Sequence, residues 1–325
     1  MDATGSGEDD ASSPGHIDAV ARRAVETAAW APSLPGTRPW WFTVHGDRVR
    51  LSAESGGRET LISGGAALHT LRLAIRAAGH APEIHALPDP GRPLLLAEAR
   101  VGGPLPVLED AQRMCAQAGR RRTHRGAFRP SAVIGPILSA LRFEAEAEGA
   151  GLLRLVGTHT RGALVALTHA ADHARHCSPG REAETARWEP SAEDVRQTGV
   201  YGDARPDDPP HTGAHCAVHG RTWGARPSVT GTGLLITTRT DGPHAWLRAG
   251  QALQRVLLRA GAEHGLAAAF HTQALEIPEL REFIRVRFCS GAYPQVLLRL
   301  GEPDGPGRAP DQRPAAPVVA DERRT

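Results

Sequence analysis

The chain has 325 residues, with 38 basic and 36 acidic side chains and a net charge of +2. At about 150 residues per domain, this length predicts two domains or one duplicated domain, and the balanced charge argues against a nucleic-acid-binding or membrane-surface protein. Every basic residue is an arginine, because the chain contains no lysine, and it contains no asparagine either. Schiff-base enzymes, lysine-dependent phosphate loops and protein kinases need a lysine amine, so these classes are excluded.

The cysteines and the N-terminal residues bear on the compartment. Four cysteines occur without any Cys-x-x-Cys spacing, which fits neither a disulfide framework nor a cysteine-only zinc site. The first sixteen residues include four acidic residues and no arginine, unlike a secretory signal. No apolar run approaches the ~18 residues of a membrane span. We therefore expect a soluble, cytoplasmic protein with reduced thiols and with neither a membrane nor a nucleic acid as partner.

The first elements are predicted in chain order. Apolar and alanine positions recur at helical spacing over 17–30, and an Ala-Pro-Ser turn ends this helix. Two strand-like runs, 40–44 and 48–52, flank a short Gly-containing connection that is typical of a hairpin. A second amphipathic helix is predicted over 65–80, with a glycine near its end.

The second helix recurs later in the chain. Residues 250–265 match 65–80 at an offset of 185 positions, and each copy is followed by a proline and an apolar run, at 93–102 and 294–301. The matched positions are Gly65/Gly250, Ala67/Ala252, Leu68/Leu253, Leu73/Leu258 and Ala77/Ala262. A duplicated unit explains the matches. Chance similarity between two Ala- and Leu-rich helices is the alternative.

The remaining segments complete the expected organisation. Helical patterns cover 131–148 and 161–177, and strand-like runs cover 152–156 and 232–238. The segment 178–230 is rich in Gly, Pro, His and Arg, and its length is more typical of a lid than of a plain connection. We expect an acidic disordered tail at 1–16, a first half at 17–106, a second half at 107–301 that contains the lid-like segment, and a Pro- and Gly-rich tail at 302–325.

The densest charge lies at 119–129, with five arginines between positions 120 and 129. Guanidinium groups beside a hydroxyl and near a helix start can bind phosphate through paired hydrogen bonds and the helix dipole. A solvated surface cluster is the alternative. In the turn 31–41, proline and glycine precede Trp40 and Trp41. On a strand these two side chains point to opposite faces, so that one could flank a flat ligand, unless both pack in the core.

Together these motifs resemble the Acg branch of the nitroreductase-like flavoproteins. The resemblance runs from about residue 17 to 317 and rests on the Ala-Pro-Ser turn with Thr37, Pro39 and Trp40, the arginine segment ending in Phe128, and residues 57–68, 246–258 and 294–301. In that family one chain is a fused pair of nitroreductase-like halves that holds FMN. The resemblance therefore implies a monomeric α+β protein in which helices pack around a mostly antiparallel sheet in each half.

The resemblance implies one composite FMN site between the halves. The Arg-x-Ser/Thr-x-Arg pattern occurs only in the second half and the Pro-Ser turn before Pro-Trp only in the first, so the other potential site is expected to be degenerate. By similarity, Arg121 and Thr123 bind the FMN phosphate, with Arg313 as a weaker candidate, and Arg125 lies by the pyrimidine edge of the ring. The ring is expected to contact Pro32 and Ser33 from the first half and, at its reactive edge, Phe270, Thr272 and Gln273.

The turn departs from the family pattern Ala-Pro-Ser-x-His-Asn-x-Gln-Pro-Trp. Pro35, Gly36 and Arg38 stand where the family has His, Asn and Gln. Three polar side chains near the expected flavin are thereby changed, one of them to a cation, so the family's flavin affinity and substrate choice do not carry over from the resemblance.

The implied activity is two-electron transfer from NADH or NADPH, through FMN, to a flat electron-poor acceptor such as a nitroaromatic or a quinone. The flavin carries this chemistry, and no side chain has to act as an acid or base. The lid-like segment and the altered turn motivate the alternative, a flavin-binding protein that sequesters FMN or senses redox state without turnover.

Two clusters of histidine and cysteine, at 169–177 and 211–219, have a spacing that can bind zinc. The chain has 16 histidines and lacks two other common polar residues, so histidine is simply frequent here. We therefore expect no metal.

Overall fold

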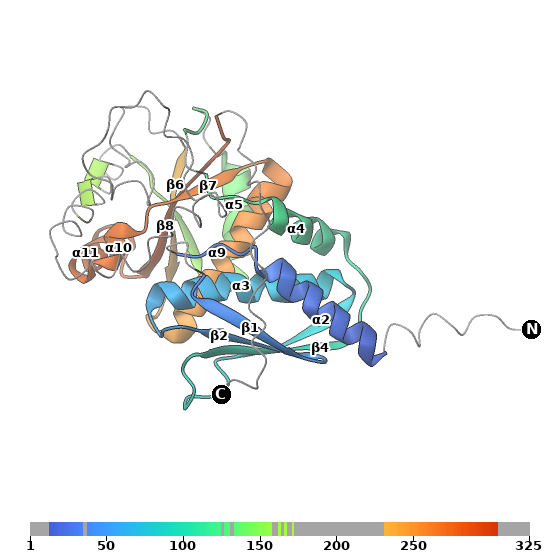
Figure 1. The fold of residues 1–325 in the computed structure, drawn as a ribbon. Coiled ribbons are helices and arrows are strands. Elements are labelled where there is room, and N and C mark those ends of the chain that lie inside the picture. Colours follow the sequence, from blue (N-terminus) through green and yellow to red (C-terminus); the bar gives the residue numbers. More distant parts are fainter. Residues whose placement is uncertain are drawn as a thin grey trace, which may run out of the picture.

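A computed structural model of the chain describes residues 13–34, 38–124, 127–130, 133–157, 162–163, 166–167, 171 and 231–304. Helices and strands follow each other in an order that occurs twice (Figure 1). The first half contains α2 (Pro14–Ala28), β1 (Trp40–His45), β2 (Arg48–Ala53), α3 (Arg58–Ala77), β3 (His80–Ala86) and β4 (Leu95–Pro104). After α4 (Glu109–Arg120), the second half contains α5 (Gly135–Glu146), β5 (Gly151–Arg154), β6 (Thr232–Thr238), α9 (Pro243–His264), β7 (Ala267–Phe270), α10 (Gln273–Glu276), α11 (Pro278–Phe288) and β8 (Tyr293–Gly301).

The two sheets repeat the same topology. Each is a four-stranded antiparallel sheet, in the order β1-β2-β4-β3 and β5-β6-β8-β7. In each half the central pair of strands is therefore the second and the fourth along the chain. The expected α+β fold with a duplicated unit and mostly antiparallel sheets is confirmed.

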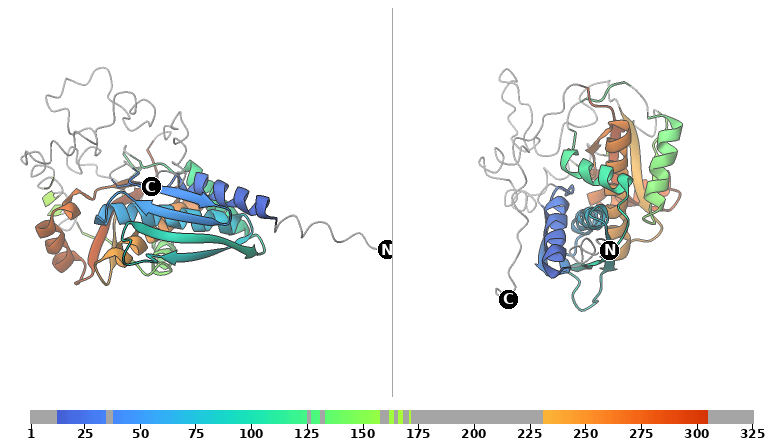
Figure 2. Two further views of the ribbon diagram at one scale, coloured as in Figure 1. Left: turned by 60° about the horizontal axis from the view of Figure 1, so that its bottom comes forward. Right: turned by 90° about the vertical axis from the view of Figure 1, so that its right-hand side faces the viewer.

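Helices cover the sheets in corresponding ways. In the first half, α2 and α3 lie side by side against the sheet, as Figures 1 and 2 show. In the second half, α5 packs beside α9, and α11 packs against β8. Strand β6 is buried along its whole length because its side chains alternate between two layers: Leu234 and Ile236 belong to the core under α9, and Leu235 packs with Ile284 of α11. This explains why the three central residues of β6, Leu234 to Ile236, are all apolar instead of alternating with polar residues.

The central contact of the molecule is the crossing of α3 and α9. Both helices are buried on most sides, as expected of helices that pack against a partner as well as a sheet. Each helix also contributes to the other half's core: Leu247 of α9 packs among the first half's apolar residues, and Ile62 of α3 among those of the second. The halves are consequently joined by one continuous interior.

Several predicted elements agree closely with the structure. The predicted hairpin is β1 and β2, with Gly46 in the left-handed region at φ +57°, and the predicted strand 232–238 is β6. Helix α2 begins at Pro14, within the expected tail, because the Ser13 hydroxyl accepts a hydrogen bond from the backbone N–H of His16 at 3.3 Å. Both long helices begin seven residues before the predicted windows, α3 at Arg58 and α9 at Pro243.

Other expectations fall outside the described residues. They concern nearly all of the predicted helix 161–177, the lid-like segment, both zinc-compatible clusters and most of the two tails. Among the residues that the structure describes, no helix is long and apolar enough to cross a membrane.

Candidate functional site

The arginine segment lies against the edge strand of the second sheet. Thr123 forms a parallel bridge with Ala268 of β7, and the backbone N–H of His124 donates to the Ala268 carbonyl at 2.7 Å. Because β7 ends at Phe270, this pairing brings the predicted phosphate-binding segment beside the strand that leads to Thr272 and Gln273. Residues distant in sequence are thus neighbours, as the predicted site requires.

Arg121 connects this segment to the first half. Its Nη2 donates to the Trp30 carbonyl at 3.4 Å, two residues before the Pro32-Ser33 turn. Its Nε is buried and has no hydrogen-bond partner within the described chain. Burial, together with the neighbouring charge of Arg122, lowers the pKa of the Arg121 guanidinium to about 10. Arg121 is therefore a desolvated cation for which the described residues supply no carboxylate.

Arg122 and Trp30 add a contact that the sequence analysis missed. The Arg122 guanidinium carbon lies 4.5 Å from the centre of the Trp30 ring, and its Nη1 donates to the Arg121 carbonyl at 2.7 Å. The Arg122 Nε is also buried without a partner among the described residues, and burial lowers the pKa of this group. The available sequence signal was the position of Trp30, immediately before the Ala-Pro-Ser turn.

The turn itself is anchored on α3. Pro32 is buried, and the Ser33 hydroxyl accepts a hydrogen bond from the backbone N–H of Arg38 at 3.2 Å. The Leu34 backbone N–H donates to the Ser63 hydroxyl at 2.8 Å, and the Leu34 side chain packs in the core of the second half. The turn of the first half is therefore fixed at the interface with the second.

The segment after β7 is buried. Phe270 is half-buried, whereas Thr272 and Gln273 are buried. The Gln273 Oε1 is fully buried and accepts no hydrogen bond from the described residues. A buried amide oxygen without a donor is costly, so this atom is a candidate acceptor for a ligand N–H or O–H.

His271 adopts one protonation state. Its Nε2 accepts a hydrogen bond from the Arg299 Nε at 2.9 Å, so its ring proton lies on Nδ1. Burial, and secondarily the charge of Arg299, holds its pKa well below the ordinary value. His271 is consequently neutral and is unsuited to act as a proton donor at neutral pH.

Arg58 joins the same segment to α3. Its Nη1 donates to the Gln295 carbonyl at 2.7 Å and its Nη2 to the Leu275 carbonyl at 3.0 Å. Sequence reasoning did not identify Arg58, because its partners are more than 200 positions away.

The structure thus places most of the predicted residues around one interface. Arg121 hydrogen-bonds to Trp30 just before the turn, and Thr123 pairs with β7, which ends at Phe270. The segment that contains Gln273 is tied to α3 through the hydrogen bond of Arg58 to Leu275. In the described part of the chain, neither Thr272 nor Gln273 hydrogen-bonds to the arginine segment. Arg125, Arg313, Pro35 and Gly36 lie outside the described residues.

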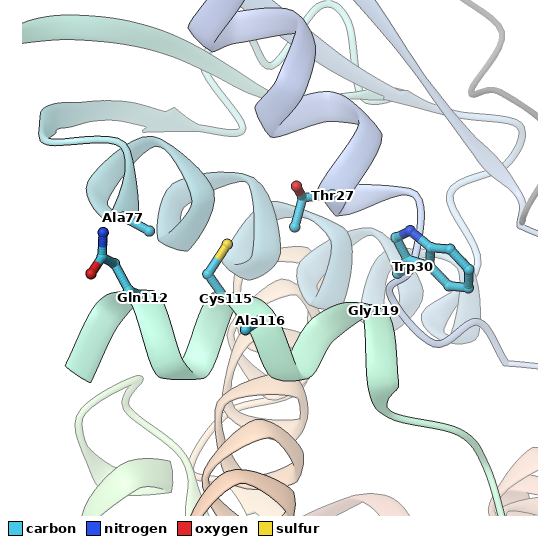
Figure 3. Close-up of a pocket in the computed structure, with 7 residues that line it drawn as sticks. All are labelled: Thr27, Trp30, Ala77, Gln112, Cys115, Ala116 and Gly119. Carbon is cyan, nitrogen blue, oxygen red and sulfur yellow. The ribbon is translucent and has the colours of Figure 1, made fainter. Parts of the chain in front are cut away.

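A surface pocket of about 390 Å³ adjoins the Trp30 end of this interface. Figure 3 shows Gln112, Cys115, Ala116 and Gly119 of α4 on one side of it. On the other side are Thr27 of α2, Trp30 just after α2, and Ala77 of α3. Trp30 therefore borders both this pocket and the arginine segment, but the pocket does not contain the other predicted site residues.

The corresponding position in the second half has a different chemistry. Trp30 follows the last residue of α2 by two positions, and Glu148 follows the last residue of α5 by two. Glu148 pairs with Arg72, with Arg255 Nη1 at 3.1 Å and with His69 Nδ1 at 3.4 Å. Here the arginines have carboxylate partners. The two corresponding positions therefore differ as anion sites, because only the arginines beside Glu148 already have a carboxylate partner.

Comparisons with known proteins give the family. No family model matches the chain. Two relatives from Mycobacterium tuberculosis H37Rv are named "Putative NAD(P)H nitroreductase Rv3131" and "Putative NAD(P)H nitroreductase acg". The first is 32% identical over 305 residues, which cover 87% of this chain and 86% of the relative. The second is 28% identical over 323 residues, which cover 91% and 93%.

The chain is also similar to solved nitroreductase structures, at lower sequence identity. A nitroreductase with bound FMN from Bacteroides fragilis has a TM-score of 0.40 and 12% identity, covering 64% of this chain and 97% of its own. The FMN-dependent nitroreductase NfnB from Mycobacterium smegmatis, in complex with NADPH, has a TM-score of 0.42 and 16% identity, covering 60% and 90%. On the sequence identity to Rv3131 across most of both chains, this chain belongs to the nitroreductase-like family, in the branch that includes Acg.

Proposed function

We propose that the chain is an FMN-dependent oxidoreductase of nitroreductase type with one FMN site between its halves. The observation that carries this proposal is the pair of desolvated guanidinium groups at Arg121 and Arg122, whose Nε atoms have no partner in the described part of the chain. A buried cation without a counter-ion is costly unless a ligand supplies the negative charge. A phosphate monoester has the charge and the acceptor oxygens to do so.

The residues present fit FMN as the ligand. Arg121, Arg122 and the Thr123 hydroxyl would hold the phosphate, and the buried Gln273 Oε1 would accept a hydrogen bond from the ring system. Pro32 and Ser33 would contact the ring from the first half, and Phe270 and Thr272 from the second. When bound, FMN supplies reversible two-electron chemistry, passing electrons from a reduced nicotinamide to a flat electron-poor acceptor.

The protein's contribution to this activity is to bind and orient the flavin and to exclude water from it. The turn is held by Ser63 and the β7 edge by the arginine segment, so both contact surfaces are fixed before a ligand arrives. Neutral His271 neither donates nor takes a proton at neutral pH. No acid or base among the described residues is needed for this function.

The test of the site is an FMN titration followed by flavin fluorescence. Arg121→Ala combined with Thr123→Ala removes two hydrogen-bonding groups, each worth about 1.5–3 kcal/mol when one partner is charged. We expect FMN affinity to fall by at least about tenfold. Arg120→Ala is the matched control, because Arg120 is exposed on the same segment and should bind nothing. Equal FMN affinity of the double variant and the wild type would refute the assignment.

The test of the activity is an anaerobic titration of the FMN-loaded protein with NADPH, followed by its visible absorbance. Loss of the flavin band is expected. A band that persists through excess NADPH and then NADH would contradict turnover and favour the alternative of flavin sequestration.

A further inference from the structure

Arg38 has a backbone conformation that costs energy. Its φ is +48°, in the left-handed region, although it is not a glycine and precedes Pro39. Such a conformation is unfavourable for a residue with a side chain and persists only where surrounding contacts enforce it. The hydrogen bond from the Arg38 backbone N–H to the Ser33 hydroxyl, at 3.2 Å, is one such contact. The backbone of Arg38, from which its side chain leaves, is therefore held by the same turn that the proposed site uses.

The Arg38 guanidinium has no counter-ion in the described part of the chain. Its side chain is half-buried, and burial lowers its pKa with no charged neighbour contributing. Three half-buried arginines elsewhere, Arg72, Arg255 and Arg281, pair with carboxylates. A partly desolvated cation of this kind can bind an anion strongly, because less water has to be displaced.

Arg38 is not among the groups that the proposed phosphate site uses. Arg121 and Arg122 lie on the arginine segment of the second half, whereas Arg38 is tied to Ser33 in the turn of the first half. The proposed function therefore assigns a ligand to Arg121 and Arg122 and none to Arg38.

We propose that Arg38 is a specificity-determining residue that binds an anionic group, a carboxylate or a phosphate, on a small molecule entering beside the Ser33 turn. This inference rests on the proposed function, which supplies two classes of such molecules. The anion belongs either to the nicotinamide donor, as the phosphate that distinguishes NADPH from NADH, or to the electron acceptor. In both cases the planar guanidinium offers paired hydrogen bonds to two oxygens.

The experiment uses calorimetry, without turnover, to measure how tightly each ligand binds to the FMN-loaded protein. One arm compares NADP⁺ with NAD⁺, and the other compares 4-nitrobenzoate with uncharged 4-nitrobenzyl alcohol. In Arg38→Gln we expect the charged member of one pair to bind at least about tenfold more weakly and its uncharged or less charged counterpart to be unchanged. The affected pair identifies the source of the anion. Arg22→Gln, which removes an exposed arginine of α2, should leave all four affinities unchanged.

Two further measurements make the outcomes separable. Arg38→Lys keeps the charge but not the planar fork, so it should retain part of the discrimination. FMN affinity of Arg38→Gln should equal that of the wild type. The proposal is overturned if the discrimination within both pairs is the same in Arg38→Gln and the wild type, or if FMN affinity falls instead. If the wild-type protein binds no FMN, the proposed function is contradicted. The role of Arg38 is then tested separately, by calorimetry of the same four ligands with the FMN-free wild type and Arg38→Gln.

Discussion

Gly65 of α3 and Gly250 of α9 are in direct contact where the two central helices cross. A Cβ atom on Gly65 would lie 3.0 Å from the Gly250 Cα and 2.1 Å from the Leu247 carbonyl oxygen. A Cβ on Gly250 would lie 2.9 Å from the Gly65 Cα and 1.9 Å from the Ile62 carbonyl oxygen. Both glycines and both carbonyl residues are separated by 185 positions, the offset of the sequence repeat. The crossing therefore has the reciprocal contacts of a two-fold interface within one chain.

Gly65→Ala and Gly250→Ala should each destabilise the protein. Because backbone atoms occupy the space that the added methyl group needs, the helices must separate, at a cost of about 1–3 kcal/mol or more. Gly119→Ala is the control, since nothing lies within 4 Å of a Cβ at this helical position, and it should be neutral or stabilising by about 0.5–1 kcal/mol. Urea unfolding measures all three. Equal midpoints for Gly65→Ala and Gly119→Ala would contradict the close crossing.

The same contact shows what the sequence could predict. Repeated spacing around Gly65 and Gly250 indicated a duplicated helix, and two strand-like runs around a short Gly-containing connection indicated the β1–β2 hairpin, because both patterns are local. Strand β7 escaped prediction because three of its four residues are alanines, which have low strand propensity; it is a strand because it pairs with β8. Strand β3 contains Pro82, which is tolerated because β3 is an edge strand.

The site was predictable only in part, for a related reason. Arg121, Thr123 and the turn were identified through motifs, each of which is contiguous in sequence. The contacts of Arg122 with Trp30, and of Arg58 with Leu275, depend on how the halves pack, so no spacing within either segment indicates them. Helix α4 was missed because its buried face, Ala111, Met114 and Ala118, contains mostly alanine in a chain rich in alanine.

Arg121→Met should not destabilise the FMN-free protein. The substitution removes a desolvated, unpaired cation and keeps an unbranched apolar side chain, so the free energy of unfolding should be unchanged or higher. In excess FMN the order should reverse, because only the wild type gains the full stabilisation from binding. Thermal unfolding with and without FMN measures both. A lower melting temperature of the FMN-free variant would mean that Arg121 has a structural role instead.

Arg58→Met should weaken the contact between the halves. It removes two hydrogen bonds from a charged donor to the carbonyls of Gln295 and Leu275, and both carbonyls lie in the other half. We expect a loss of about 2–4 kcal/mol in the free energy of unfolding. Arg58→Lys keeps the charge but cannot reach both carbonyls, so it should lie between the wild type and Arg58→Met. If Lys and Met are equally destabilising, the stabilisation depends on the paired geometry of the guanidinium and the charge alone contributes nothing; if neither is destabilising, the contact itself contributes nothing.

Glu148→Gln should remove stability that depends on pH. Burial alone would raise the pKa of this carboxyl, but the hydrogen bond of His69 and the hydrogen bond and charge of Arg72 outweigh burial and hold the pKa at about 2, below its ordinary 4.5. A carboxyl whose pKa is lower in the folded state stabilises the fold above its unfolded pKa, and this stabilisation is lost as the pH falls through the folded value. The contribution of Glu148 should thus be complete above about pH 4.5 and decline toward pH 2.

At pH 7 we expect Glu148→Gln to lower the free energy of unfolding by on the order of 3 kcal/mol, because Arg72 and Arg255 lose their buried carboxylate. The difference from the wild type should shrink as the pH is lowered from about 4.5 toward 2, where Glu148 is itself protonated. Asp18→Asn, which breaks an exposed pair with Arg22 on α2, is the matched control and should change little at any pH. Urea unfolding of the three proteins across this range measures the effect. A difference that stays constant between pH 7 and pH 2 would show that Glu148 acts through its shape and not through its charge.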